Sequence, residues 1–174
     1  MPQQPVKGYR ALREGRFSQP GGLYFITFCA HERAPGLATT LIAPAILAEL
    51  AALQTDEIWS LHCGTIMPNH IHLLIELGLS LPLGKAVARL KAKTSPFLRI
   101  AGLKWQPGYF DHRLRHQESL LPYFTYTYLN PYRANLLPAD EKWPWFLSSP
   151  KDEDWFLPML NQQLPEPTWL TDLP

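Results

Sequence analysis

The sequence predicts an α+β protein in which helices pack against one antiparallel sheet. Three observations lead to this prediction. Short runs of aromatic and β-branched residues are separated by turn residues, as in strands joined by tight connections. Longer stretches between them place apolar residues at helical spacing. The chain has 174 residues, of which 46% are hydrophobic and 18% charged, which suits a single domain with its own core.

The first half of the chain contains a predicted strand, a helix and a hairpin. Residues 23–30 (LYFITFCA) follow two glycines and have the composition of a strand. Residues 43–53 combine good helix formers with leucine and isoleucine at helical spacing. Residues 58–66 and 70–77 are predicted strands on either side of a Met-Pro-Asn turn (67–69), so we expect them to pair.

The second half adds a helix, a strand and a last helix. Residues 83–100 form a basic helix, which Pro96 is expected to kink or split by removing one backbone donor. Residues 105–115 alternate as a strand does, and residues 118–130 are helical, with Pro122 tolerated in the first turn. The first six elements follow the order of a split βαβ, or ferredoxin-like, antiparallel sheet with two helices on one face. The last helix is an addition.

The composition excludes several classes of protein. No apolar run approaches the ~18 residues that a membrane span requires, and residues 6–16 are too basic and polar for a signal peptide. Cys29 and Cys63 are too few for a disulfide framework or a cysteine zinc site. The 18 prolines come without a short repeat, so a collagen-like or low-complexity chain does not fit. We therefore expect a soluble, cytosolic protein.

Charge is unevenly distributed, although the net charge is only +1. Residues 83–135 carry a net charge of +7, whereas residues 136–174 carry −5. A basic middle third beside an acidic end suits a polyanionic partner. A solvated helix face explains the charge pattern equally well when it is taken alone.

His70 and His72 are the first candidates for chemistry. Residues i and i+2 of a strand point to the same face, so the two imidazoles project together near the start of their strand. Two neutral imidazoles in this arrangement can bind a divalent metal ion. The motif is short, and a pair of surface or core histidines is the commoner explanation for it.

Tyr126 and Asn130 make the metal hypothesis more specific. They are four residues apart and therefore share one face of the last predicted helix. A tyrosine beside a metal site can attack a phosphodiester and become its covalent carrier, while the metal binds the non-bridging oxygens. The helix is rich in aromatic residues, and the residues alone do not distinguish Tyr126 from Tyr128.

Three segments together resemble a known family. MPNHIHLLIE (67–76), WQPGYFDHRLR (105–115) and YTYLNPYRANL (126–136) are similar, in order and spacing, to segments of the REP-associated tyrosine transposases. Those proteins are Y1 HUH nucleases, related to the small insertion-sequence transposases of bacteria. The resemblance covers roughly residues 7–147 and implies the HUH fold. That fold is the ferredoxin-like sheet with helices on one face, plus a C-terminal helix that carries the nucleophile.

The resemblance also implies roles for individual residues. His70 and His72 would be the metal ligands, with Mg²⁺ or Mn²⁺ as the ion, and Asn130 would complete the metal site from the helix. Tyr126 would be the nucleophile that forms a 5′-phosphotyrosine link and releases a 3′-hydroxyl.

Further residues are assigned to support and to DNA contacts. Asp111 and His112 match the Asp-His strand of the family and are expected to support the site. The candidates for contacts with DNA phosphates are four basic residues of the middle third: Lys91, Arg113, Arg115 and Arg133.

The predicted activity is metal-dependent cutting and rejoining of single-stranded DNA at hairpin-containing, REP-like palindromes. Two alternatives remain open. One is a domesticated DNA-binding module without cleavage. The other is a metal-dependent phosphodiesterase without a covalent step, in which Tyr126 would be structural.

The resemblance leads to expectations for organisation as well. Residues 1–147 are expected to form the transposase domain, and residues 148–174 a Pro- and Trp-rich acidic tail packed on it or flanking it. A monomer is favoured over a homodimer. The expected location is the bacterial cytoplasm, in association with the nucleoid and not with a membrane.

Overall fold

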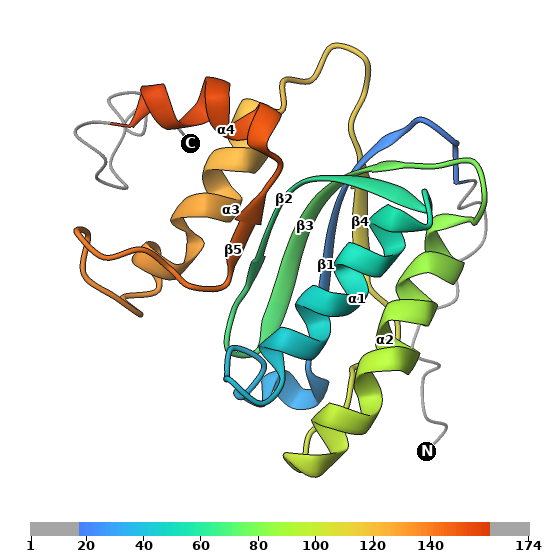
Figure 1. The fold of residues 1–174 in the computed structure, drawn as a ribbon, viewed down its shortest axis with the longest axis vertical. Helices are drawn as coiled ribbons and strands as arrows, with labels where there is room; N and C mark the ends of the chain where they lie inside the picture. Colours follow the sequence, from blue (N-terminus) through green and yellow to red (C-terminus); the bar gives the residue numbers. More distant parts are fainter. Residues whose placement is uncertain (1–17, 161–174) are drawn as a thin grey trace, which may run out of the picture.

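The computed structural model describes residues 18–160, and its centre is a five-stranded antiparallel sheet (Figure 1). The strands lie in the order β4-β1-β3-β2-β5. Their bounds are Leu23–Cys29 for β1, Trp59–Ile66 for β2, His70–Leu77 for β3, Phe110–Arg113 for β4 and Phe146–Ser148 for β5. The order β4-β1-β3-β2 is the predicted ferredoxin-like arrangement, which β5 extends at the β2 edge.

The helices lie on both faces of this sheet. The predicted helical pair, α1 (Ala43–Thr55) and α2 (Leu83–Ile100), covers one face. The added helix α3 (Leu121–Arg133) and the short α4 (Pro150–Phe156) pack on the other face, towards β2 and β5 (Figure 1). Two short 3₁₀ segments, η1 (His31–Arg33) and η2 (Leu157–Met159), follow β1 and α4.

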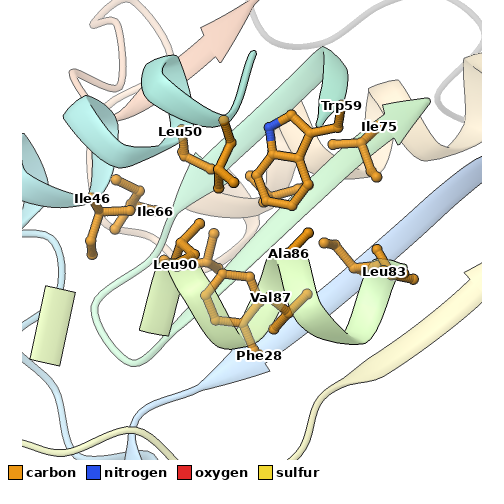
Figure 2. Packing of buried hydrophobic residues seen from close by; sticks show 14 of the residues in the cluster. Phe28, Ile46, Leu50, Trp59, Ile66, Ile75, Leu83, Ala86, Val87 and Leu90 are labelled. Carbon is orange, nitrogen blue, oxygen red and sulfur yellow. The ribbon is translucent and has the colours of Figure 1, made fainter. Parts of the chain in front are cut away.

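Strand alternation divides the core into two layers. Along β1, Tyr24, Ile26 and Phe28 belong to the larger cluster beneath α1 and α2, whereas Phe25 belongs to the smaller cluster beneath α3. Figure 2 shows side chains from both helices and from the sheet meeting in the larger cluster. The smaller cluster does not fill its face of the sheet. The polar residues of the candidate site lie on the same face.

Pro96 was predicted to kink or split its helix. The α2 helix runs unbroken through Pro96, so the split is wrong. The Thr94 hydroxyl donates to the Leu90 carbonyl at 2.7 Å, and the Ser95 hydroxyl donates to the Lys91 carbonyl at 2.6 Å. Both hydrogen bonds lie in the helical turn before the proline. Pro96 is exposed, so its ring meets solvent and not a packed neighbour. The missing backbone donor is therefore accommodated without ending the helix.

The predicted strand over 105–115 is shorter in the structure. Only Phe110–Arg113 pairs regularly with β1, and Trp105 forms a single bridge with Ala30. Pro107 has no N–H, and Gly108 has a φ of 77°, so the intervening backbone leaves the strand conformation.

The last predicted helix is displaced by three residues, to Leu121–Arg133. Pro122 lies in its first turn, as predicted. Glu118 lies before the helix, and its carboxylate pairs with His112.

The residues after 145 add one strand and one helix that the sequence did not reveal. β5 pairs with β2, and the Ser149 hydroxyl caps α4 by accepting from the Asp152 N–H at 3.1 Å. Asp152 is buried and accepts hydrogen bonds from His62 and Trp155, both at 3.0 Å. Residues 161–174 of the predicted tail lie outside the described residues, as do residues 1–17. No helix within 18–160 has the length and apolar character that a membrane span needs.

Candidate functional site

His70 and His72 lie at the start of β3, on the sheet face that α3 covers. Their ring centroids are 4.6 Å apart, and the ring planes are nearly perpendicular. Across the sheet, His72 is paired with Thr27 of β1 on one side and with Thr65 of β2 on the other. The predicted projection of both imidazoles to one face is thus present.

Each ring is oriented by a hydrogen bond at its Nδ1 atom. His70 Nδ1 donates to Asn69 Oδ1 at 2.6 Å, which leaves its Nε2 with the free lone pair. His72 Nδ1 lies 2.7 Å from the Thr27 hydroxyl. The Nε2 atom of His72 is buried and has no hydrogen-bond partner within residues 18–160. Burying a nitrogen without a hydrogen-bond partner costs free energy, so we expect this atom to bind a ligand.

Both imidazoles are neutral at pH 7. Burial, with a further contribution from the charge of Arg33, lowers the pKa of His70 from 6.5 to about 4. Burial, followed by the neighbouring His70 and by Arg33, lowers the pKa of His72 to about 3. Neutral imidazole is the form that donates a lone pair to a metal ion.

Tyr126 is the tyrosine that the structure brings to the histidines. Its ring meets the His72 ring edge-on at 5.1 Å between centroids, and its side chain is 39% exposed. Tyr128 points elsewhere, into a cluster with Phe146 and Phe156. Burial raises the pKa of Tyr128 well above its usual value. The geometry therefore separates two tyrosines that the composition of the helix, taken alone, left equivalent.

Asn130 follows Tyr126 by one helical turn and is half-buried. Its side chain makes no hydrogen bond within the described part of the chain, so its amide oxygen is available. Residues 18–160 contain no group of three or more His, Cys, Asp or Glu residues that could hold a metal ion. Joined by the Asn130 amide oxygen, the two imidazoles would make a mixed donor set that fits a six-coordinate ion such as Mn²⁺ or Mg²⁺, with positions left for substrate oxygens.

Asp111 and His112 face opposite sides of the sheet because they are consecutive strand residues. Asp111 is paired with Ile26, on the face of α1 and α2, so the structure does not bring it to the histidines. His112 is on the face of α3, where its Nε2 lies 2.7 Å from a Glu118 carboxylate oxygen.

Glu118 links His112 to α3. The Tyr123 hydroxyl donates to the same Glu118 oxygen at 2.9 Å, and the Tyr123 ring stacks on His112 at 5.6 Å. Hydrogen bonds from His112 and Tyr123 lower the pKa of Glu118. Sequence reasoning missed Glu118, because nothing local marks a loop glutamate as the partner of a strand histidine.

Lys91, a predicted phosphate contact, is turned towards the protein. Its Nζ donates to the backbone carbonyl of Gln106 at 2.9 Å and to that of Gly108, and it lies 5.5 Å from the Phe28 ring centroid. Burial lowers its pKa to about 8. In this structure the ammonium group holds the irregular segment before β4.

The three predicted arginines are all exposed. Arg113 donates to the side-chain oxygen of Gln19 at 2.5 Å. Arg115 and Arg133 have no side-chain hydrogen bond or ion pair to any of residues 18–160. All three guanidinium groups are thus accessible to an anionic ligand.

Comparisons with known proteins bear on the family and the fold of the chain. Residues 20–119 match the family model described as "Transposase IS200 like". The chain is 25% identical over 136 residues to the REP-associated tyrosine transposase of Escherichia coli (strain K12), covering 74% of this chain and 78% of that protein. It also resembles, with a TM-score of 0.63 and 22% identity, a solved structure of a REP-associated tyrosine transposase bound to a REP hairpin. That alignment covers 75% of this chain and 79% of the other, and at this identity it shows the fold alone.

Proposed function

The chain belongs to the IS200-like transposases, a family of enzymes, and on this premise we propose that it cuts and rejoins single-stranded DNA at hairpin-containing repeats. In this proposal Tyr126 is the nucleophile. His70, His72 and Asn130 hold a divalent metal ion, Mg²⁺ or Mn²⁺, and His112 supports the site through Glu118 and Tyr123.

One observation carries the proposal. The exposed Tyr126 ring lies 5.1 Å from the ring of His72, whose buried Nε2 has no partner within residues 18–160. A metal ion bound at this nitrogen would supply the missing partner beside an accessible phenol. A nuclease needs this arrangement, because the metal-binding nitrogen and the attacking oxygen must both reach the same phosphate.

The protein's own residues can perform a balanced transfer. The Tyr126 oxygen forms a bond to phosphorus and gives its proton to solvent, while the bond from phosphorus to the 3′ oxygen breaks. The 3′ oxygen leaves with the electron pair and takes up a proton, so the products are a 5′-phosphotyrosine and a 3′-hydroxyl. Rejoining is the reverse attack by a 3′-hydroxyl. A bound divalent ion would offset the charge that develops on the non-bridging oxygens.

Two features support DNA as the partner. The similar solved structure contains a REP hairpin. In this chain, Phe110 on the edge strand β4 is 60% exposed and lies in the same row of the sheet as Thr27 and His72. An exposed aromatic ring at this position offers a stacking surface for a base of the strand that enters the site.

The proposal extends to organisation. Residues 1–147 are proposed to form the transposase domain, with residues 148–174 as a tail that packs on it or flanks it. The chain is proposed to act as a monomer in the bacterial cytoplasm, on hairpins of the nucleoid DNA.

The test is to incubate the protein with Mn²⁺ and labelled single-stranded hairpin DNA and to resolve the products on denaturing gels. A covalent protein–DNA adduct that is lost in Tyr126→Phe and kept in Tyr128→Phe is the expected result. Cleavage without an adduct, unchanged in Tyr126→Phe, would favour the hydrolytic phosphodiesterase. Retarded DNA without cleavage would leave a binding module.

A further inference from the structure

We propose that Arg33 is a phosphate-binding residue that holds the scissile phosphate of the DNA against the His70–His72 pair. This inference rests on the proposed function and adds a residue that the motifs did not indicate. It is supported by the backbone around Arg33, by the anchoring of its loop and by the state of its charge.

The backbone at Arg33 is strained. Glu32 and Arg33 have φ values of 55° and 56°, two consecutive non-glycine residues in the left-handed region. Within residues 18–160 the other non-glycine residues with positive φ are Glu57 and Asn135. Each of those two follows the C-cap of a long helix, where this conformation is common. Glu32 and Arg33 are instead the central residues of a tight turn, closed by the Ala34 N–H, which donates to the His31 carbonyl at 3.1 Å. Non-glycine residues seldom adopt this conformation, so the turn is strained at both positions.

The loop that carries Arg33 is fastened to the turn that precedes His70. The Ala30 N–H donates to the Asn69 carbonyl at 2.9 Å, and the Arg33 N–H donates back to the Ala30 carbonyl at 3.1 Å. Beyond Arg33, the N–H groups of Gly36 and Leu37 both donate to the Pro68 carbonyl at 2.8 Å. The strained residues are therefore held on both sides by the residues that lead into the histidine pair.

The Arg33 charge is uncompensated by the described chain. Its side chain is exposed and makes no ion pair or hydrogen bond to residues 18–160. Glu32, its neighbour, points its carboxylate to His31 at 3.5 Å.

The loop of Arg33 is bonded to the turn that leads into the histidines, so a phosphodiester at the metal site would lie next to this loop. The unpaired, planar guanidinium matches two phosphate oxygens at once. Arg33 and the metal site would then bind the same phosphate from different directions, and Arg33 would stabilise the charge that grows on it during attack by Tyr126.

The strain permits a clean test, because glycine adopts the observed φ without penalty. Arg33→Gly removes the guanidinium and relieves strain, so its urea midpoint should equal or exceed that of the wild type. Glu32→Gly is the matched control, since it relieves the same strain and keeps the guanidinium. Arg33→Lys keeps the charge without the planar fork.

We expect the rate of adduct formation at saturating hairpin DNA and Mn²⁺ to fall roughly 100-fold in Arg33→Gly, the loss typical of one charge-stabilising donor. Arg33→Lys should recover part of this rate, and Glu32→Gly should match the wild type. In the Tyr126→Phe background, Arg33→Gly should weaken hairpin binding about tenfold.

Three results would overturn the proposal: an unchanged rate in Arg33→Gly, an equal loss in Glu32→Gly, or a lower urea midpoint for Arg33→Gly that accounts for its loss. A wild-type protein that forms no adduct would instead contradict the proposed function. In that event the binding comparison alone decides the role of Arg33.

Discussion

Two threonines flank His72 in its row of the sheet, and only one of them contacts it by a hydrogen bond. The Thr27 hydroxyl is 2.7 Å from His72 Nδ1, whereas the Thr65 hydroxyl is buried without a partner within residues 18–160. Thr27 is therefore the group that sets the orientation of the imidazole and keeps its Nε2 directed at the site.

This contact predicts a difference between two similar variants. Thr27→Val should weaken Mn²⁺ binding about 10- to 100-fold, the usual effect of removing the partner of a metal-binding histidine. Thr65→Val should leave Mn²⁺ binding unchanged and raise the free energy of unfolding by about 1 kcal/mol, because it removes an unpaired buried hydroxyl. Calorimetric titration and urea unfolding measure the two quantities. Equal Mn²⁺ affinity in both variants would contradict this role of Thr27.

The lowered pKa of Lys91 predicts that the stability of the folded protein depends on pH. Its pKa is about 8 in the folded protein and near 10.5 in the unfolded chain, so between these values the unfolded chain holds more protons. Folding is then favoured as the pH rises. The wild type should gain stability relative to Lys91→Met between pH 7.5 and pH 9.5 in urea unfolding.

The exposed Lys93 supplies the control for this measurement. Lys93→Met removes an exposed ammonium from the same helix, and its unfolding is measured over the same pH range. A difference between wild type and Lys91→Met that does not change with pH would contradict the effect of burial on the Lys91 ammonium.

The residues that sequence reasoning could assign are those whose geometry is local. The spacing of His70 and His72 on a strand, and of Tyr126 and Asn130 on a helix, follows from the backbone period alone. Thr27 could not be assigned, because its contact with His72 depends on the register of strands that lie 45 residues apart in the chain.

At the scale of elements, α2 combines an interior proline with an unbroken helix. Pro96 lacks the N–H that would bind the carbonyl of Ala92, and both residues are exposed. The helix persists because its buried face, with Leu90, Thr94 and Leu98, packs under the sheet. Tertiary packing thus outweighs the local preference.

Pro96→Ala should therefore stabilise the protein by about 1–3 kcal/mol, since it restores a backbone hydrogen bond and removes the clash of the ring. Urea unfolding measures the change. Phe97→Ala, at the neighbouring exposed position, is the control and should change stability by less than about 1 kcal/mol. A less stable Pro96→Ala protein would show that the proline ring contributes packing that the structure does not reveal.

The long elements of the sheet and helices were predictable, and the short ones were not. β3 is bounded by a turn and has a clear composition, so its predicted range of 70–77 is confirmed. β5 has only three residues and exists because it pairs with β2, more than 80 residues earlier in the chain. β4 is shortened by Pro107 and Gly108, whose effect on the alternating pattern is visible only in the backbone.

For the molecule as a whole, the basic middle third divides into two groups of cations. Arg89 pairs with Glu49 and Asp56 at 2.8 and 2.7 Å and so ties α2 to α1, while Lys91 binds backbone carbonyls. Arg115 and Arg133 are exposed and have no such partner among residues 18–160. Net charge by segment could suggest a polyanionic ligand, but only the fold separates the structural cations from the accessible ones.

This division predicts the salt dependence of DNA binding. Arg115→Ala should reduce the slope of log affinity against log salt concentration by about 0.7, the value for one phosphate contact with a single strand. Arg89→Ala removes the same charge from a structural pair and should leave the slope unchanged while lowering stability. Fluorescence anisotropy with labelled hairpin DNA at several salt concentrations measures both. Equal slopes for the two variants would mean that net charge alone governs binding.

The most direct test of the whole account is to identify the residue that carries DNA after reaction. The adduct formed with Mn²⁺ and hairpin DNA would be trimmed with nuclease, digested with protease and analysed by mass spectrometry. The account predicts a nucleotide attached through its 5′ phosphate to the peptide that contains Tyr126, and to the Tyr126 oxygen itself. Attachment to Tyr128 or Tyr123, or cleaved DNA with no modified peptide, would contradict it.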